Sequence, residues 1–196
     1  MVKNLVSTFS ATAYGDSHMV PIEESLLVSA INPHGQTKWI GEQTLRELGP
    51  SDGDWHTICL RYFNPVGAHE SGSMGEDPRG IPNNLMPSVA HVAIGKFVRL
   101  RVFGRDYPTP DGTCVHDYIH VMDFAQRHVA ALSRLFCNCS SLTINLGSGS
   151  WCSLLDVLRS YEKSSGLLIT HEIVERRPGD IAVCYADLAL VAEVLD

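Results

Sequence analysis

The sequence predicts an α/β fold, because apolar stretches typical of strands alternate along the chain with stretches of helical periodicity. The first two strand-type stretches are LVSTF at residues 5–9 and HTICLRYF at residues 56–63, and each is followed by small or polar residues. Between them, GQTKWIGEQTLREL at residues 35–48 places Ile40 and Leu48 on one stripe of a helix.

The rest of the chain continues this alternation. GPSDGD at residues 49–54 contains the turn residues that end the first helix. A loop rich in glycine, proline and aspartate covers residues 64–84, and its length predicts a functional role. Further helices are expected near 84–97, 120–136 and 151–164, and strands near 99–103, 141–147 and 167–174. The last residues, up to Asp196, are expected to begin another helix.

The composition is that of an ordinary soluble globular protein, since 44% of the 196 residues are hydrophobic and 19% are charged. A chain of this size forms one large domain or two small ones. The net charge of -7 argues against a nucleic-acid partner, although local arginines can still bind a small anion.

The sequence also predicts a cytoplasmic protein. The first twenty residues contain no apolar run of signal-peptide length, and no window approaches the ~18 apolar residues of a membrane span. Six cysteines are scattered without a C-x-x-C pair, which is typical of reduced thiols rather than of a disulfide framework.

His34 and Lys38 stand four residues apart at the start of the first predicted helix, so their side chains share one face. A cation at that distance suits a proton-handling group, although the same pair occurs on many exposed helices. Ser10 favours a functional interpretation, because it follows a predicted strand and open α/β sheets bind ligands at that end. Asn83 and Asn84 precede another predicted helix, whose N-terminus would favour an anion.

Several blocks of the sequence resemble the UDP-glucose 4-epimerase family, whose members are NAD-dependent proteins of the extended short-chain dehydrogenase/reductase superfamily. The resemblance covers essentially the whole chain, in order and at matching spacings. It rests on SATAYGD, RYFNPVGAHESGSMGEDPRGIPNNLMP, VFGRDYPTPDGTCVHDYIHVMD, NLGSG and RRPGDIAVCYAD. Long ungapped blocks of this kind are far more specific than a lone glycine pattern.

The resemblance implies a partial Rossmann-like parallel sheet with a smaller mixed α/β substrate domain. Residues 1–65 would form the C-terminal part of an NAD-binding domain. Residues 66–196 would form mainly a UDP-sugar-binding domain, with segments that return to the first. The implied activity is the interconversion of UDP-glucose and UDP-galactose. In the family a tyrosine takes the proton of the sugar 4-hydroxyl while the C4 hydride passes to NAD, and the hydride then returns to the other face.

The resemblance also carries roles onto individual residues. It places catalytic residues at Ser10, His34 and Lys38, and cofactor-binding residues at the same three positions and at Phe63. It places UDP-sugar-binding residues at Asn64, Asn84, Leu85, Arg101, Val102, Phe103, His116, Arg177, Asp180 and Cys184. An arginine suits a diphosphate, because its planar fork meets two phosphate oxygens. In the family, a small residue at the position of Cys184 accompanies acceptance of N-acetylated UDP-sugars. The alternative, held to the same degree, is that Cys184 is an inert buried thiol.

The chain departs from the family pattern in three ways. His34 occupies the position of the catalytic tyrosine, and His116 occupies that of an arginine before DYIHV. The glycine-rich βαβ unit at the start of the family is missing, as is the family's C-terminal tail. We therefore expect the chain to hold NAD weakly. We also expect an exposed strand edge that favours association, for example as a homodimer.

A histidine in the tyrosine position changes the chemistry. Imidazole is a competent base near neutral pH, but it is shorter than a phenol and lacks the negative charge of tyrosinate. A misplacement of about 1 Å can cost about 100-fold in rate. We therefore expect catalysis by His34 to be impaired.

Two other functions stay open. A catalytically silent UDP-sugar-binding or interaction protein is favoured by the two histidine replacements and the missing start. A nucleotide-sugar dehydratase of the same superfamily fits less well, because those enzymes carry an acidic residue after the serine, where this chain has Ala11 and Thr12.

Two local patterns carry weaker signals. His116 and His120 stand four residues apart, but no H-E-x-x-H glutamate or cysteine cluster accompanies them, so we expect no metal site. GSGSWC at residues 147–152 lacks the last glycine of a dinucleotide-binding turn. We expect it to be a structural turn.

Overall fold

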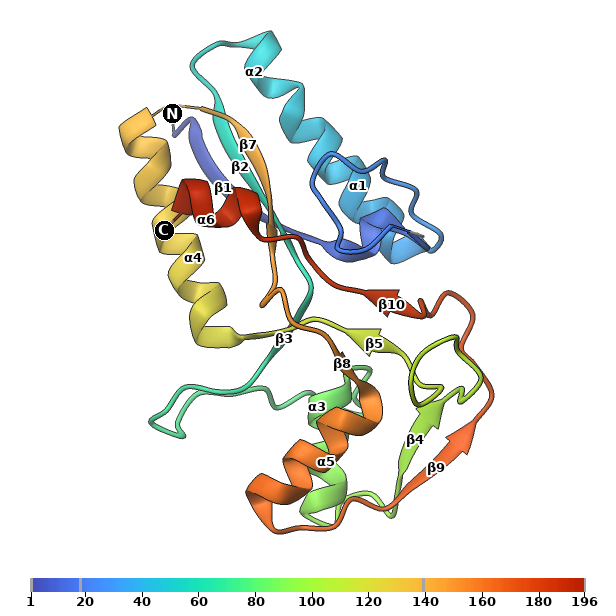
Figure 1. Cartoon of the computed structure of the whole chain (residues 1–196). Coiled ribbons are helices and arrows are strands. Elements are labelled where there is room, and N and C mark those ends of the chain that lie inside the picture. The colour runs from blue at the N-terminus through green and yellow to red at the C-terminus, as the bar shows by residue number, and fades with distance from the viewer. Residues whose placement is uncertain (1, 18, 139, 196) are drawn as a thin grey trace.

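The structure is a computed structural model and describes residues 2–17, 19–138 and 140–195. A three-stranded sheet lies at the centre of the larger lobe, in the order β1 (Asn4–Ser10), β2 (His56–Tyr62) and β7 (Leu142–Leu146) (Figure 1). All three strands are parallel, and their register aligns Ser10 with Tyr62 and Tyr62 with Leu146. The carboxyl ends of the strands therefore lie at one edge of the sheet.

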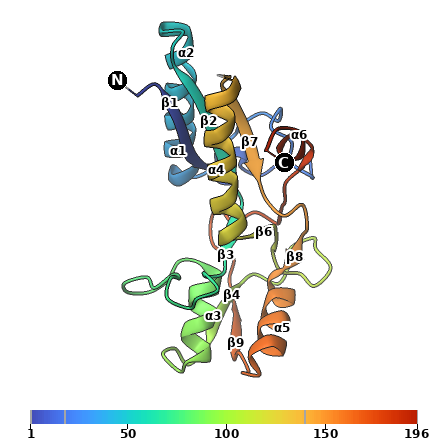
Figure 2. The same ribbon diagram turned by 90° about the vertical axis from the view of Figure 1, so that its left-hand side faces the viewer.

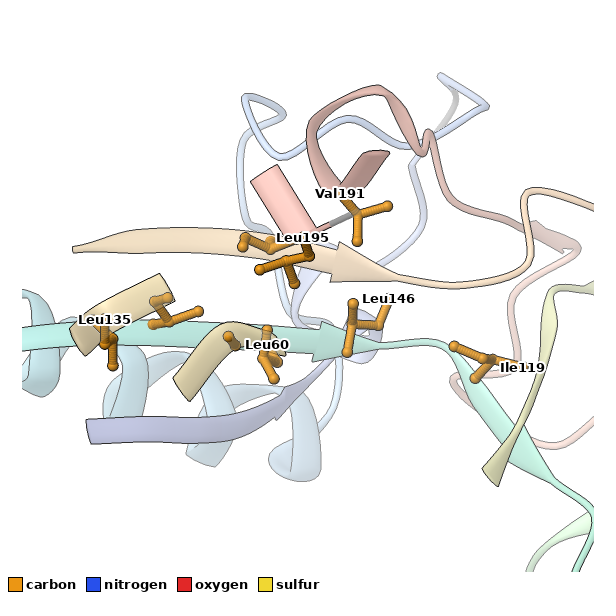
Figure 3. Packing of buried hydrophobic residues seen from close by; sticks show 9 residues of the cluster. Leu60, Ile119, Leu135, Leu146, Val191 and Leu195 are labelled. Atoms are coloured by element: carbon orange, nitrogen blue, oxygen red, sulfur yellow. The ribbon is translucent and has the colours of Figure 1, made fainter. Parts of the chain in front are cut away.

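Helices cover both faces of this sheet. α1 (Pro33–Arg46), extended by the short α2 (Leu48–Ser51), lies on one face, and α4 (Val121–Asn138) with α6 (Ala189–Leu195) lies on the other (Figure 1). Aliphatic side chains fill the space between the sheet and the second pair of helices (Figure 3). The buried members of this core are Ile58, Leu60, Ile119, Ala131, Leu135, Ile144, Leu146, Val191 and Leu195.

Local sequence determines where α1 begins. Pro33 takes the first helical position, where its missing N–H is not needed, and the Asn32 side chain accepts a hydrogen bond from Gly35 N at 2.8 Å. Gly35 also allows a close approach, because a Cβ here would lie 2.6 Å from the carbonyl oxygen of Thr12. Thr12 belongs to the 3₁₀ helix η1 (Ala11–Tyr14), which continues β1. The first turn of α1 is therefore packed against the end of β1.

A smaller lobe lies beyond the carboxyl ends of the strands (Figure 2). It contains the parallel pair β4 (Leu100–Phe103) and β9 (His171–Val174), with α3 (Leu85–Ala93) and α5 (Leu154–Ser165) beside it. Its own core consists of the buried residues Val89, Val92, Leu100, Val102, Leu158 and Ile169.

Short strands join the lobe to the sheet. β3 (Asn64–Val66) pairs with β6 (Tyr118–His120), and β5 (Val115–His116) lies between β10 (Val183–Cys184) and β8 (Cys152–Ser153). These pairs bring four separate parts of the chain together at the junction.

The buried carboxylate of Asp117 holds this junction together. It accepts hydrogen bonds from the backbone N–H groups of Ser148, Gly149 and Ala186 at 2.7, 3.1 and 3.2 Å. The stretch at residues 147–152, predicted to be a structural turn, thus binds a carboxylate of the protein itself through its backbone.

The predicted helices and strands agree with the structure to within a few residues, with two larger differences. The helix expected over 84–97 ends at Ala93, because Gly95 adopts a φ of 74° that stops it. The strand expected over 167–174 begins only at His171, because the N–H of Ile169 bonds the Glu162 side chain of α5. The two- and three-residue strands of the junction were not predicted, since they are too short to show a period of two.

β1 forms an open edge of the sheet, because no strand among the described residues pairs with its outer side. Leu5 on this strand is 36% exposed. At the start of the strand, Lys3 forms ion pairs with Asp52 and Asp54 at 2.7 and 3.0 Å. No helix in the described part of the chain combines the length and the apolar character needed to cross a membrane.

Candidate active site

A cavity of about 570 Å³ lies between the carboxyl ends of β1 and β2 and the smaller lobe. Ser10 and His34 line it on the sheet side, and Asn84, His116 and Arg177 line it on the lobe side. A cavity of this size is typical of ligand sites, and α/β sheets bind ligands at the carboxyl ends of their strands. The cavity therefore brings together predicted catalytic residues and predicted substrate-binding residues.

Ser10 lines the cavity at the last position of β1. It caps η1, and its Oγ accepts hydrogen bonds from Thr12 N at 3.3 Å and from Thr12 Oγ1 at 3.0 Å. Because these bonds use both acceptor lone pairs, the hydroxyl proton of Ser10 remains for a ligand. Ser10 can thus act as a hydrogen-bond donor at the sheet side of the cavity.

His34 and Lys38, both on α1, differ in exposure and in their position relative to the cavity. His34 lies in the first turn, is exposed and lines the cavity, together with Asn32 just before the helix. Lys38 follows one turn later, is half-buried and is not among the lining residues. The structure therefore places an imidazole in the cavity with an ammonium group one helical turn behind it.

The buried Phe63 and the half-buried Asn64 continue the sheet-side wall after β2. The Asn64 side chain donates to the carbonyl oxygen of Asp117 at 3.2 Å, which ties the wall to the junction strands. At the cavity mouth, Asn84 Nδ2 donates to Glu76 Oε1 at 3.1 Å, and Leu85 begins α3 beside them. The long loop over 64–84 thus contributes directly to the lining, in keeping with its predicted functional role.

The opposite wall carries the cationic group. Arg177 Nε donates to Asp180 Oδ2 at 3.1 Å, and its guanidinium lies 4.5 Å from the ring centre of Phe103. Arg101 approaches the same ring at 5.6 Å from outside the lining. Val102 is fully buried in the lobe core and contributes no lining. Of the predicted stretch 101–103, only Phe103 therefore reaches the cavity.

His116 lines the cavity from β5, the central strand of the junction sheet. Burial lowers the pKa of its imidazole below the ordinary value; the carboxylate of Asp180 opposes this shift, and the guanidinium of Arg177 reinforces it. His116 is therefore neutral near pH 7. The carboxylate and guanidinium side chains of the lining are those of Glu76, Arg177 and Asp180.

Two thiols also line the cavity. Burial, reinforced by the nearby carboxylate of Asp117, raises the pKa of the Cys184 thiol to about 12. Burial likewise raises the pKa of Cys114. Both residues are therefore protonated thiols that offer a small, weakly polar surface. Cys114 was not predicted as a site residue, and nothing in its local sequence indicated its position.

A buried ion pair behind the sheet-side wall was not predicted from the sequence. Arg61 on β2 donates to the carboxylate of Glu42 on α1 through Nε at 2.8 Å and through Nη2 at 2.6 Å. A signal for this pair was present, because an arginine within the apolar run ICLRYF requires a partner once it is buried. The identity of that partner depends on the fold.

The described residues hold no group of three or more His, Cys, Asp and Glu side chains that could bind a metal ion. His116 lines the cavity, whereas His120 is exposed and lies outside the lining. The two histidines that stand four apart in the sequence are therefore not joined in one site.

Comparison with known proteins identifies the family. A model of the NAD dependent epimerase/dehydratase family matches residues 1–147. The chain belongs to this family. The UDP-glucose 4-epimerase of Bacillus subtilis (strain 168) is 52% identical over 188 residues, which cover 96% of this chain and 56% of that protein. The UDP-glucose 4-epimerase of Mus musculus is 50% identical over 195 residues, which cover 99% of this chain and 56% of that protein.

Solved structures of the family agree with the fold. A UDP-glucose 4-epimerase from Stenotrophomonas maltophila, with bound NAD and formylated UDP-arabinopyranose, is 47% identical with a TM-score of 0.96. One from Bifidobacterium longum, in complex with NAD+ and UDP, is 47% identical with a TM-score of 0.92. Each match covers 99% of this chain and 58% of the other. The predicted resemblance and the α/β fold are thus confirmed, and the chain spans about half the length of these relatives.

Proposed function

We propose that this chain binds a UDP-sugar and the nicotinamide end of NAD, and that it takes part in the interconversion of UDP-glucose and UDP-galactose. One observation carries the proposal. A single cavity has proton-handling groups, Ser10 and His34, at one side and the guanidinium of Arg177 at the other. A sugar nucleotide requires this separation, because its reacting hydroxyl and its diphosphate lie at opposite ends of the sugar. Relatives at about 50% identity are UDP-glucose 4-epimerases, which supports the same function.

The residues present fit the nicotinamide half of NAD. Ser10 offers a hydroxyl proton, Phe63 offers an apolar ring, and His34 offers an imidazole at the end of the sheet where dinucleotides bind. The sequence contains no G-x-G-x-x-G turn that would hold the pyrophosphate at a helix N-terminus. We therefore expect weak affinity for NAD in this chain.

Bound NAD would supply the acceptor for the C4 hydride of the sugar and the donor that returns it. His34 would take the proton of the 4-hydroxyl as the C4–H bond breaks, so that the alcohol becomes a ketone, and would give the proton back on return. Ser10 would donate a hydrogen bond to the sugar oxygen. Arg177 would hold the diphosphate, because its fork matches two phosphate oxygens.

A second candidate is a UDP-sugar-binding protein without turnover. The observation that favours it is His34, since an imidazole is shorter than tyrosinate and carries no negative charge. Both candidates predict binding of UDP-sugars, and they differ only in the chemical step.

We also propose that the protein is cytoplasmic and self-associates. The free thiols at Cys59, Cys114, Cys137, Cys152 and Cys184 support a reducing compartment. The open outer edge of β1 supports association, because its unpaired backbone groups offer hydrogen bonds to a second chain. Light scattering of the purified chain at several concentrations tests this, and a monomer at every concentration would contradict it.

The decisive experiment assays the purified chain for conversion of UDP-galactose to UDP-glucose with added NAD. It also measures UDP binding by calorimetry. We expect UDP binding, low turnover, and a clear gain in turnover in the His34→Tyr variant. His171→Tyr is the matched control, because it makes the same chemical change at an exposed position of β9 that lies outside the cavity. UDP binding without turnover in either protein favours the silent binding protein, and absence of UDP binding contradicts both candidates.

A further inference from the structure

Glu42 and Arg61 form a fully buried ion pair that the proposed reaction does not use directly. Their exposed fractions are 0% and 1%. The guanidinium meets the carboxylate with two hydrogen bonds, from Nε to Oε2 at 2.8 Å and from Nη2 to Oε1 at 2.6 Å. Such a fork defines both a distance and an orientation, which a single contact does not.

Stability alone is a weak explanation for this pair. Removing two charges from water costs several kcal/mol per ion, and well-packed apolar residues in their place are often neutral or stabilising. The carboxylate of Glu42 also lies 2.9 Å from Arg46 Nη2, so one buried anion serves two guanidinium groups. A costly arrangement of this kind is best explained by the geometry that it imposes.

The position of the pair in the fold indicates that it fixes α1 relative to β2. Glu42 lies on α1 about one helical turn beyond Lys38 and about two turns beyond His34. Arg61 lies on β2, two residues before Phe63, which lines the cavity. The fork therefore joins the helix that carries the proposed base to the strand that leads into the sheet-side wall.

The same guanidinium also reaches η1. Arg61 Nη1 donates to the hydroxyl of Tyr14 at 2.7 Å, and that hydroxyl donates to Asn145 Oδ1 at 2.7 Å. Tyr14 ends η1, which is capped by Ser10. One buried cation is thus hydrogen-bonded to α1, which carries His34, and to η1, which Ser10 caps.

We propose that Glu42 and Arg61 are positioning residues for the proposed reaction. They set the rotation of α1 about its axis, so that His34 and Lys38 are presented to Ser10. The effect is large enough to matter, because side chains reach about 5–6 Å from a helix axis, and a rotation of about 10° moves their tips by about 1 Å. A displacement of about 1 Å can cost about 100-fold in rate. For its catalytic consequence, this inference rests on the proposed function.

The test compares Glu42→Leu, Arg61→Leu and the double variant by urea unfolding, and compares crystal structures of the parent and the double variant. We expect each single variant to have a lower urea midpoint, because it leaves one buried charge unpaired, and the double variant to regain most of the loss. We expect the first turn of α1 in the double variant to shift by about 1 Å relative to β1. The double variant Arg99→Leu/Glu172→Leu is the control with the same chemical change, because it removes an exposed ion pair of 3.2 Å between Arg99, just before β4, and Glu172 on β9, away from the cavity.

Kinetics in the His34→Tyr background add a second readout. The Glu42→Leu/Arg61→Leu change is expected to lower kcat about 100-fold with little change in KM, because the lobe-side wall is untouched. Arg61→Lys keeps the charge but loses the fork, and is expected to lower kcat in the same direction. If the double variant fails to fold, the kcat of Arg61→Lys tests the positioning role in its place.

The outcomes separate the inference from the proposed function. A stable double variant with an unmoved α1 would overturn the positioning role, and so would an unchanged kcat in Arg61→Lys. Absence of turnover in the His34→Tyr parent would count against the proposed function instead. In that case the crystal structures still decide whether the pair positions α1.

Discussion

The two walls of the cavity are built in different ways. On the sheet side, buried hydrogen bonds connect Tyr14, Glu42 and Arg61 directly behind the residues that line the cavity. On the lobe side, the guanidinium of Arg177 is partly exposed and its only carboxylate partner among the described residues is Asp180, three positions along the same loop. Behind the first wall, buried hydrogen bonds join distant elements, whereas the ion pair of Arg177 in the second wall is local and partly exposed.

This difference suits the two tasks of a sugar-nucleotide site. Proton transfer depends on geometry at the level of about 1 Å, so the groups that perform it need a rigid setting. Binding a diphosphate depends mainly on charge, which acts over longer distances and tolerates some movement. We therefore expect substitutions behind the sheet-side wall to change stability, and substitutions in the lobe-side wall to change affinity.

The largest expected effect distinguishes two buried tyrosines. Tyr14→Phe removes a hydroxyl that accepts from Arg61 and donates to Asn145, each at 2.7 Å. Both groups would be left buried without that partner, so the free energy of unfolding should fall by about 3 kcal/mol. Urea denaturation measures this change.

Tyr107→Phe in the lobe is the matched comparison. The Tyr107 hydroxyl is buried and has no hydrogen-bond partner of normal geometry among the described residues. Its removal should leave the free energy of unfolding unchanged or slightly higher. Equal losses in the two variants would show that the walls do not differ in this way.

A smaller effect is expected for Arg177→Ala, which should weaken UDP binding about tenfold without a change in the urea midpoint. The substitution removes the cation that would meet the diphosphate and leaves the carboxylate of Asp180 to repel it. Calorimetry with UDP measures the change. Arg99→Ala is the control, because Arg99 is paired with Glu172 outside the cavity. Similar affinity in both variants would remove Arg177 from the site.

The smallest expected effect is a dependence of stability on pH that comes from His116. Burial lowers the pKa of this imidazole in the folded state, whereas an unfolded histidine titrates near ~6.5. As the pH falls below ~6.5, the unfolded chain takes up a proton that the folded chain does not, so folding stability decreases until the folded pKa is passed. His116→Gln should flatten this part of the curve of urea midpoint against pH. An unchanged slope would mean that burial does not lower the pKa of His116 in the folded state.

Much of the fold and part of the site could be predicted from the sequence. The alternation of strand-type and helical stretches located β1, α1 and β2, because each shows its period within a short window. Of the predicted site residues, Ser10, His34 and Arg177 do line the cavity, whereas Lys38, Arg101 and Val102 do not. The catalytic and binding roles of all these residues stay predictions.

The sequence by itself determined the family and the local features, namely the α/β order, the cap of α1 and the histidine at position 34. These features are read from residues close together in the chain. Only the tertiary structure decided that Glu42 meets Arg61, that Asp117 binds the backbone at Ser148, and that burial lowers the pKa of His116. Each of these depends on contacts between residues that are far apart in the sequence. A local pattern of apolar and polar residues does not specify such contacts.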